Sequence, residues 1–345
     1  MEYKRKVIEP DELKALFPLD KASIEKKLEN DKQIKDIFEG KDNRLLLIIG
    51  PCSADREDAV LEYCKKLAKL QEKVKDQIFI IPRIYTNKPR TTGEGYKGML
   101  HQPDPNKKAD MVHGIVAVRK LHMSVLQETG FSTADEMLYP ENHEYLSDII
   151  SYVAVGARSV ENQFHRLVSS GVDVPVGMKN PTSGDYSVMM NSVFAAQHPH
   201  TFTYRGWEVD TTGNPYTHVI LRGSVNKYGI TIPNYHYEDI KRVIKMYPSD
   251  KYQNPAIVID CNHSNSGKKF EEQIRIAKEV LHSTRHDEEV FKYVKGLMIE
   301  SYLVDGNQDV NGGVYGQSIT DPCLGWEKTE KLVLELAELR KNENK

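Results

Sequence analysis

Cysteine is scarce in this sequence, and the few that occur lie far apart. There are 4 among 345 residues and no two have CxxC spacing; they are Cys52, Cys64, Cys261 and Cys323. This pattern argues against a disulfide framework. We therefore expect each of them to be a free thiol, a core residue or a ligand.

Long hydrophobic stretches are also missing. The longest apolar runs have about the length of a β-strand, whereas a membrane-spanning helix needs ~20 predominantly apolar residues. The N-terminal segment 1–6 is charged and lacks the apolar stretch of a signal peptide. The sequence thus predicts a cytoplasmic protein without a membrane partner.

Neither sign of charge dominates. The 47 Lys and Arg residues nearly balance the 50 Asp and Glu residues, which leaves a formal net charge of -3. Because no global cationic field exists, we expect no nucleic-acid partner, and any anionic ligand has to be bound by a local cluster of cations. Hydrophobic residues make up 39% and charged residues 28%, a globular composition that excludes collagen-like and disordered classes.

Motifs for nucleotide, zinc-protease and hydrolase chemistry are absent. The chain contains no GxxxxGK(S/T), HExxH or GxSxG. Residues 93–98 read GEGYKG, but this GxGxxG follows a basic loop and leads to Pro103 and Pro105, not to a helix. We expect no nucleotide cofactor. His282 and His286 have the spacing of a metal pair on a helix, yet no carboxylate or Cys completes the set, so a solvated helix face is favoured.

From residue 45 onward, short apolar runs alternate with amphipathic segments, which is typical of parallel strands buried on both faces and joined by helices. Eight such strands suit a closed (β/α)8 TIM barrel; an open doubly wound sheet is the alternative. We predict a helical arm over residues 1–44 and a catalytic barrel over 45–345. The runs are 45–49, 78–81, a weak run near 131, 153–155, 175–178, 219–221, 256–259 and 296–299.

Two features depart from a regular barrel. Pro82 lies within the second run, where its missing N–H is expected to interrupt the ladder. The run 201–204, followed by 218–221, provides one strand too many. Since Gly213-Asn214 supplies turn chemistry between them, we predict an antiparallel hairpin inserted near 200–222, before the sixth barrel strand.

Four side chains that can bind metal follow predicted strands. Cys52, His263 and Glu300 come at the ends of strands one, seven and eight, which adjoin when a barrel closes, and Asp321 follows later. A thiolate, an imidazole and two carboxylates suit Mn²⁺, Fe²⁺, Co²⁺ or Zn²⁺ without selecting one of them. The competing interpretation is that Cys52 packs as a small hydrophobe and the carboxylates are rim charges.

Cations follow other predicted strands, at or shortly after the strand ends: Arg83, Lys88, Arg90, Arg158, Lys179 and Arg222. Crowded cations are costly unless they are paired, so this set predicts either anionic ligands or counter-charges from Glu136, Asp260 and Glu300. Two anionic substrates would explain their number. Lys179 has a rival role, because a desolvated strand-end Lys can form a Schiff base with a carbonyl substrate.

With these residues in place, the chain resembles the 3-deoxy-D-arabino-heptulosonate 7-phosphate (DAHP) synthases of the microbial class I type, which open the shikimate pathway. The resemblance extends from about Asp11 to Leu339. The matching stretches are 49–53 (IGPCS), 88–92 (KPRTT), 156–158 (GAR), 176–180 (VGMKN), 220–223 (ILRG), 260–266 (DCNHSNS), 299–301 (IES) and 318–321 (SITD).

The resemblance implies an aldol-type condensation of phosphoenolpyruvate with erythrose 4-phosphate and water, which releases phosphate. It implies one divalent metal ion on Cys52, His263, Glu300 and Asp321. It also assigns substrate contacts and the catalytic groups Lys179, Glu136, Cys52 and His263. Which group handles the proton of the attacking water stays open between Glu136, Lys179 and a metal-bound water. Phosphoenolpyruvate is assigned to Arg83, Ala157, Arg158, Lys179 and Arg222, and erythrose 4-phosphate to Lys88, Pro89, Arg90 and Thr91, with Asp321 also at the substrate.

The chain departs from the family pattern at Tyr96, His101-Gln102 and Tyr302, none of which is a proposed ligand. The resemblance further implies a homodimer or homotetramer and an aromatic amino-acid effector. Asp173 and Tyr204 align with the effector pocket, where phenylalanine-sensitive relatives have Ser, so the effector's identity is left open. Two alternative functions remain: a Schiff-base aldolase that uses Lys179, and a non-catalytic phosphosugar-binding barrel.

Overall fold

The structure is a computed structural model that describes residues 1–90, 92–248 and 250–341. Its centre is a parallel sheet of eight strands in the order β2-β1-β12-β11-β8-β5-β4-β3. A parallel bridge between Arg83 and Ala134 joins β2 to β3, so the sheet closes on itself. The TIM-barrel prediction is confirmed, and the open sheet is wrong. The strands are β1 (Leu45–Gly50), β2 (Ile78–Pro82), β3 (Ala134–Glu136), β4 (Tyr152–Val155), β5 (Val176–Lys179), β8 (His218–Leu221), β11 (Ile257–Asp260) and β12 (Val294–Glu300).

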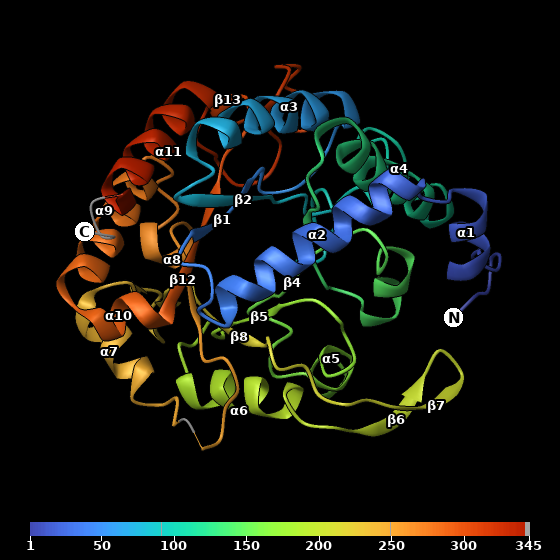
Figure 1. Cartoon of the computed structure of the whole chain (residues 1–345). Coiled ribbons are helices and arrows are strands. Elements are labelled where there is room, and N and C mark those ends of the chain that lie inside the picture. Colours follow the sequence, from blue (N-terminus) through green and yellow to red (C-terminus); the bar gives the residue numbers. More distant parts are fainter. Residues whose placement is uncertain (91, 249, 342–345) are drawn as a thin grey trace.

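Helices surround this barrel (Figure 1) and present an apolar face to it. In α3, for example, Val60, Cys64 and Leu67 recur at helical spacing and are all fully buried. The helices are α3 (Glu57–Val74), α4 (Met111–Thr129), α5 (Gln163–Ser169), α6 (Tyr186–Ala196), α7 (Tyr237–Ile244), α8 (His263–Ser266), α9 (Glu272–His286), α10 (Glu288–Tyr293) and α11 (Trp326–Lys341), with a 3-10 turn η1 (Pro140–Tyr145). No helix among the described residues is long and apolar enough to cross a membrane.

The N-terminal arm consists of α1 (Pro10–Leu16) and α2 (Lys21–Phe38). With 18 residues, α2 is the longer of these two helices. It runs across one end of the barrel (Figure 1), and Ile34, Ile37 and Phe38 pack against side chains of the barrel interior. The arm therefore covers the end of the barrel at which the strands begin.

The predicted hairpin exists, but it closes earlier than expected. Strand β6 (Thr201–Tyr204) pairs antiparallel with β7 (Trp207–Asp210). Its two-residue turn is Arg205-Gly206, and both residues have positive φ, at 51° and 82°, as a type I′ turn requires. The predicted turn at Gly213-Asn214 is wrong, because that dipeptide instead leads into the sixth barrel strand. Short pairs β9 (Ser224–Val225) with β10 (Thr231–Ile232) and β13 (Val304–Asn307) with β14 (Gln317–Ser318) extend from the barrel.

Pro82 does not interrupt the ladder. It is the last residue of β2 and pairs with Ile49 of β1. The next residue, Arg83, donates its backbone N–H to the Ile49 carbonyl at 2.9 Å, so the pairing continues past the proline. This continuation matters because it aims the Arg83 side chain at the end of the barrel where the predicted site residues lie.

Candidate active site

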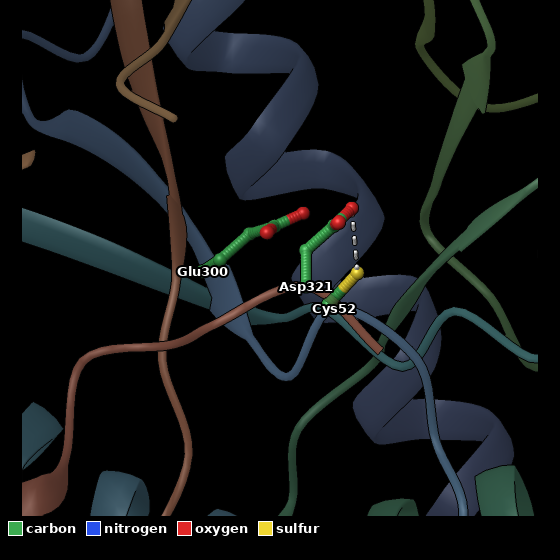
Figure 2. Close-up of side chains that lie close together, drawn as sticks. All are labelled: Cys52, Glu300 and Asp321. Carbon is green, nitrogen blue, oxygen red and sulfur yellow. Dashed lines mark hydrogen bonds between the residues drawn. The ribbon is translucent and has the colours of Figure 1, made fainter. Parts of the chain in front are cut away.

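Three of the predicted metal ligands meet where the barrel strands end. Cys52 follows β1, Glu300 is the last residue of β12, and Asp321 follows β14. One ligand atom from each lies within 4.8 Å of the others. Figure 2 shows the Cys52 and Asp321 side chains in contact, with a sulfur–oxygen distance of 3.6 Å, and Glu300 beside them.

His263, the fourth predicted ligand, begins α8 directly after β11 and lies beside this cluster. Its Nε2 atom is 3.8 Å from Glu300 Oε1, and its Nδ1 atom is 2.8 Å from Asp260 Oδ2. A carboxylate at one ring nitrogen orients the ring and leaves the other nitrogen toward the site, as is common for metal-binding histidines. His263 lies outside the compact group of Cys52, Glu300 and Asp321 but borders it.

The cluster attracts positive charge. The Lys88 ammonium lies 2.7 Å from Cys52 Sγ and 2.9 Å from Asp321 Oδ2, and Lys268 lies 3.0 Å from Asp321 Oδ1. Burial and the nearby Glu300 raise the pKa of the Cys52 thiol, although Lys88 opposes this. A divalent cation would favour the thiolate far more strongly than one ammonium can. A sulfur, an imidazole nitrogen and carboxylate oxygens together fit a first-row divalent metal.

Arg83 connects the cluster to the neighbouring cations. Its guanidinium donates to Glu300 Oε1 at 2.7 Å and to the carbonyls of Pro51 and Cys52, and it lies 3.9 Å above the ring centroid of Tyr85. Burial is the largest single influence on the pKa of Glu300 and raises it, but the charges of Arg83, His263 and Lys88 together hold the pKa of this carboxyl below its usual range. The pair is almost completely buried, with side chains 2% and 0% exposed.

Two buried guanidinium nitrogens next to the cluster lack a protein partner. The Nη1 atoms of Arg83 and Arg222 are both buried and have no hydrogen-bond partner among the described residues. Leaving buried charged donors unsatisfied is costly, whereas a phosphate or carboxylate would accept from both. Lys179, at the end of β5, lies 3.4 Å from Asp260. Arg158 is exposed and has no ion pair within the described ranges.

Glu136 ends β3 and lies against the loop that carries Arg158. A Cβ placed on Gly156 would come within 2.2 Å of Glu136 Oε1, so only glycine allows this approach. The requirement explains the first residue of the Gly156-Ala157-Arg158 stretch. Gly156 therefore lies against Glu136, and Ala157 and Arg158 follow it directly in the chain.

The loop that follows β2 carries the residues assigned to the second substrate. Its backbone is held by bonds from Lys88 N–H to Lys97 O at 3.0 Å and from Arg90 Nε to Tyr96 O at 2.9 Å. Gly98 has φ of 96° and passes so close to Thr86 that an added Cβ would lie 2.3 Å from its carbonyl oxygen. The last glycine of the GxGxxG match thus serves loop packing. Pro89 lies in this loop, and Thr91 lies outside the described residues.

Sequence reasoning missed several supporting side chains. Asn262 Nδ2 donates to Glu300 Oε2 at 2.6 Å, and Tyr85 lies beneath both Arg83 and Lys179. The position of Asn262 within the matched 260–266 stretch was a signal for it; nothing marked Tyr85. His282 and His286 are on α9 as predicted, and within the described part of the chain they belong to no group of metal-binding side chains.

Of the two positions aligned with an effector pocket, only Tyr204 lines the cleft that the described residues form beside the hairpin. Tyr204 lines a surface cleft of about 440 Å³ between the arm and the hairpin, together with Glu9, Arg205 and Trp207. Its hydroxyl donates to the Pro140 carbonyl at 3.0 Å. Asp173 is exposed and does not line this cleft.

Comparison with known proteins agrees with the geometry. Residues 20–334 match the DAHP synthetase I family. A phospho-2-dehydro-3-deoxyheptonate aldolase of Haemophilus influenzae is 37% identical over 340 residues, 96% of this chain and 91% of that protein. A Tyr-sensitive protein of the same name from Escherichia coli K12 is 36% identical over 336 residues, covering 95% and 91%. A solved structure of such an aldolase from Francisella tularensis SCHU S4 matches with a TM-score of 0.91 and 35% identity, covering 99% of each chain.

Proposed function

The chain belongs to the DAHP synthetase I family, and from this we propose how its barrel binds a metal ion and two phosphorylated substrates. The protein is a DAHP synthase: it condenses phosphoenolpyruvate with erythrose 4-phosphate and water to give DAHP and phosphate, the first step of the shikimate pathway. The site assignment rests on one observation. Cys52, Glu300 and Asp321 lie together beside two buried guanidinium groups whose Nη1 atoms have no hydrogen-bond partner among the described residues.

We propose that Cys52, His263, Glu300 and Asp321 hold one divalent ion, one of Mn²⁺, Fe²⁺, Co²⁺ and Zn²⁺. When bound, such an ion supplies Lewis acidity for polarising the aldehyde of the four-carbon sugar. Lys88 then becomes available to the second substrate, because its ammonium no longer has to neutralise Cys52 and Asp321. One thiol sulfur, one imidazole nitrogen and the oxygens of two carboxylates are ligands that each of these metals accepts, which supports the assignment.

Arg83, Arg158, Lys179 and Arg222 are proposed to bind phosphoenolpyruvate, with Ala157 beside it. The unsatisfied Nη1 atoms of Arg83 and Arg222 offer charge-assisted hydrogen bonds to its oxygens. Fixing the anion between rigid strand ends places it for attack on the aldehyde, which avoids much of the entropy cost of bringing two substrates together. Lys88, Pro89, Arg90 and Thr91 are proposed to bind erythrose 4-phosphate.

Glu136 and Lys179 are proposed as the groups that handle the proton of the attacking water. Glu136 ends β3 and Lys179 ends β5, the strands on either side of β4 in the barrel wall. Lys179 lies in an ion pair with Asp260, an arrangement that suits a cation binding an anion better than an amine nucleophile. This contact argues against the Schiff-base alternative, which borohydride trapping on Lys179 would support.

The relative from E. coli K12 is named Tyr-sensitive. We propose that an aromatic amino acid regulates this protein too, at the cleft between arm and hairpin, and that the protein is a cytoplasmic homodimer or homotetramer. Sedimentation velocity and activity measured with each aromatic amino acid test these points. A monomer at micromolar concentration, or activity that no aromatic amino acid changes, would contradict them.

The central experiment removes the metal with a chelator and restores Mn²⁺ or Co²⁺ while phosphoenolpyruvate consumption is followed. We expect activity to be lost and then recovered with erythrose 4-phosphate, and to stay low with arabinose 5-phosphate. Full activity in rigorously metal-free protein would refute the metal assignment. Binding of both substrates without any turnover would favour the non-catalytic barrel.

A further inference from the structure

A buried tyrosine of the barrel interior lies beneath the cations of the candidate active site. Tyr85 follows β2 closely and is only 1% exposed. Its side chain packs in the cluster that fills the barrel interior, together with Ile81, Tyr152 and Met298. Its backbone carbonyl accepts from the Ala54 N–H at 2.8 Å, which ties this segment to the loop after β1. The ring is therefore held in place by packing and by its own backbone.

Two cations from different strands share this ring. The guanidinium of Arg83 lies 3.9 Å from the ring centroid, and the ammonium of Lys179 lies 5.7 Å from it. Both distances fall within the ~6 Å over which the face of an aromatic ring attracts a cation. Arg83 follows β2 and Lys179 ends β5, two strands that do not pair with each other in the barrel. Tyr85 thus connects two cations that the sheet itself does not connect.

The remaining contacts of the Arg83 guanidinium leave one edge open. Nε donates to the Pro51 carbonyl, and Nη2 donates to the Cys52 carbonyl and to Glu300, at distances between 2.7 and 3.2 Å. Nη1 is buried and has no hydrogen-bond partner among the described residues. Because the ring of Tyr85 covers one face of the group, the guanidinium is fixed in an orientation that leaves Nη1 as its free donor.

Lys179 is held less tightly by the protein. Its ammonium lies 3.4 Å from Asp260 Oδ2, which is longer than an ordinary N–H···O hydrogen bond. The side chain is long and flexible, so this one ion pair restricts it little. The face of Tyr85 supplies a second surface against which the ammonium rests. It also offsets part of the repulsion between Lys179 and Arg83, since the negative face of the ring attracts both charges.

The hydroxyl of Tyr85 is engaged elsewhere. It donates to Met298 Sδ at 3.6 Å, and a thioether sulfur is only a weak acceptor. Burial raises the pKa of Tyr85 well above its usual value, so the side chain stays a neutral phenol. The two cations therefore interact with the aromatic face of Tyr85, and not with a phenolate charge.

We propose that Tyr85 is a positioning residue for phosphoenolpyruvate: its ring holds Arg83 and Lys179 in the orientation in which both bind the same anion. This inference rests on the proposed function, in which these cations bind that substrate. Without the ring, both side chains would have to be ordered when the substrate binds, and this cost would reduce the affinity. We expect the effect on phosphoenolpyruvate and not on erythrose 4-phosphate, which is assigned to residues 88–91.

The test compares Tyr85→Leu with Tyr85→Phe in the protein loaded with Mn²⁺. Isothermal titration calorimetry gives the Kd for phosphoenolpyruvate, and steady-state kinetics give kcat and both KM values. We expect Tyr85→Leu to raise the Kd and the KM for phosphoenolpyruvate roughly tenfold, because two side chains lose their support, and to leave the KM for erythrose 4-phosphate nearly unchanged. Tyr85→Phe keeps the ring and is expected to bind phosphoenolpyruvate as the wild type does. An equal loss of affinity in both variants would implicate the hydroxyl and overturn the proposal.

Tyr152→Leu is the matched control for the loss of a buried ring. Tyr152 also lies in the barrel interior, but its ring lies beside His218 and its hydroxyl is 2.7 Å from His218 Nε2. Burial lowers the pKa of His218 to about 4, so this neighbour is uncharged at neutral pH. We expect Tyr85→Leu and Tyr152→Leu both to lower the Tm, and only Tyr85→Leu to weaken phosphoenolpyruvate binding. Equal weakening in both would reveal a general effect of a cavity and would overturn the proposal. If Tyr85→Leu does not fold, Tyr85→Met repeats the test, since methionine fills irregular gaps in a core.

Lys179→Met separates a failure of this proposal from a failure of the proposed function. Lys179 is assigned to phosphoenolpyruvate directly, so its loss is expected to weaken binding at least as much as Tyr85→Leu does. Weakened binding in Lys179→Met with unchanged binding in Tyr85→Leu overturns the positioning role alone. Unchanged binding in both variants refutes the assignment of phosphoenolpyruvate to these cations, and the role of Tyr85 with it.

Discussion

The substitution Glu300→Gln separates the structural role of this carboxylate from its role as a metal ligand. Glu300 is fully buried, and its two oxygens accept from Arg83 at 2.7 Å and from Asn262 at 2.6 Å. Glutamine has the same shape but carries a donor in place of one oxygen. Its amide must therefore face one of these two donors, and the Arg83 charge loses its partner.

The expected cost follows from the burial of the pair. Removing one partner of a buried ion pair costs about 3–5 kcal/mol, since the remaining charge is left uncompensated. In a chain of 345 residues this corresponds to a fall in Tm of roughly 4–7 °C. Differential scanning calorimetry in excess chelator measures it without any contribution from metal. Metal is then added, which stabilises the wild type by about 2.7 kcal/mol at a hundred times its Kd.

Asp321→Asn is the matched control. Its side chain is 21% exposed and pairs with Lys88 and Lys268, so its loss should cost only ~1 kcal/mol in chelator. Both variants should lose the stabilisation by metal, but only Glu300→Gln should be strongly destabilised in its absence. A Glu300→Gln protein that matches the wild type in chelator, or that still gains stability from metal at wild-type concentrations, would refute this reasoning.

Three further predictions concern substrate binding, pH and backbone packing. Arg222→Met should raise the KM for phosphoenolpyruvate roughly 10- to 100-fold, because a buried charged hydrogen bond contributes about 1.5–3 kcal/mol; steady-state kinetics with an unchanged KM would contradict it. Burial lowers the pKa of His218 to about 4, so stability is full above the unfolded-state value near 6.5 and falls as the pH drops toward 4. His218→Gln should weaken that fall by up to roughly 3 kcal/mol in urea titrations at pH 7 and 4.5, and parallel pH curves would exclude it. Gly156→Ala should push the Glu136 carboxylate aside and lower kcat on the order of 100-fold at unchanged circular dichroism; wild-type turnover would show that this contact is not needed.

Much of the barrel could be predicted because its strands are buried on both faces. The runs 45–49 and 256–259 are continuously apolar, and both form strands with every residue buried. Cys52 and Glu300 each follow an apolar run, and the parallel strands of a barrel all end on the same face. The sequence therefore predicts that these two side chains lie at the same end of the barrel. Local pattern and topology were sufficient for this part.

Other features depend on contacts between distant segments. The hairpin turns at Arg205-Gly206 although Gly213-Asn214 carries the stronger turn signal, because the register of β6 with β7 decides where the chain reverses. Likewise, the covering of the barrel end by α2 has no local signal.

The sequence by itself thus determined the kind of fold, the identity of the reactive groups and the end of the barrel at which they gather, since these follow from burial patterns along single strands. Only the tertiary structure decided which charges are paired. Arg83 pairs with Glu300 across 217 positions of the chain, and Lys88 pairs with Asp321 across 233. Such pairings depend on distances of a few ångströms between side chains, which no pattern along the chain records.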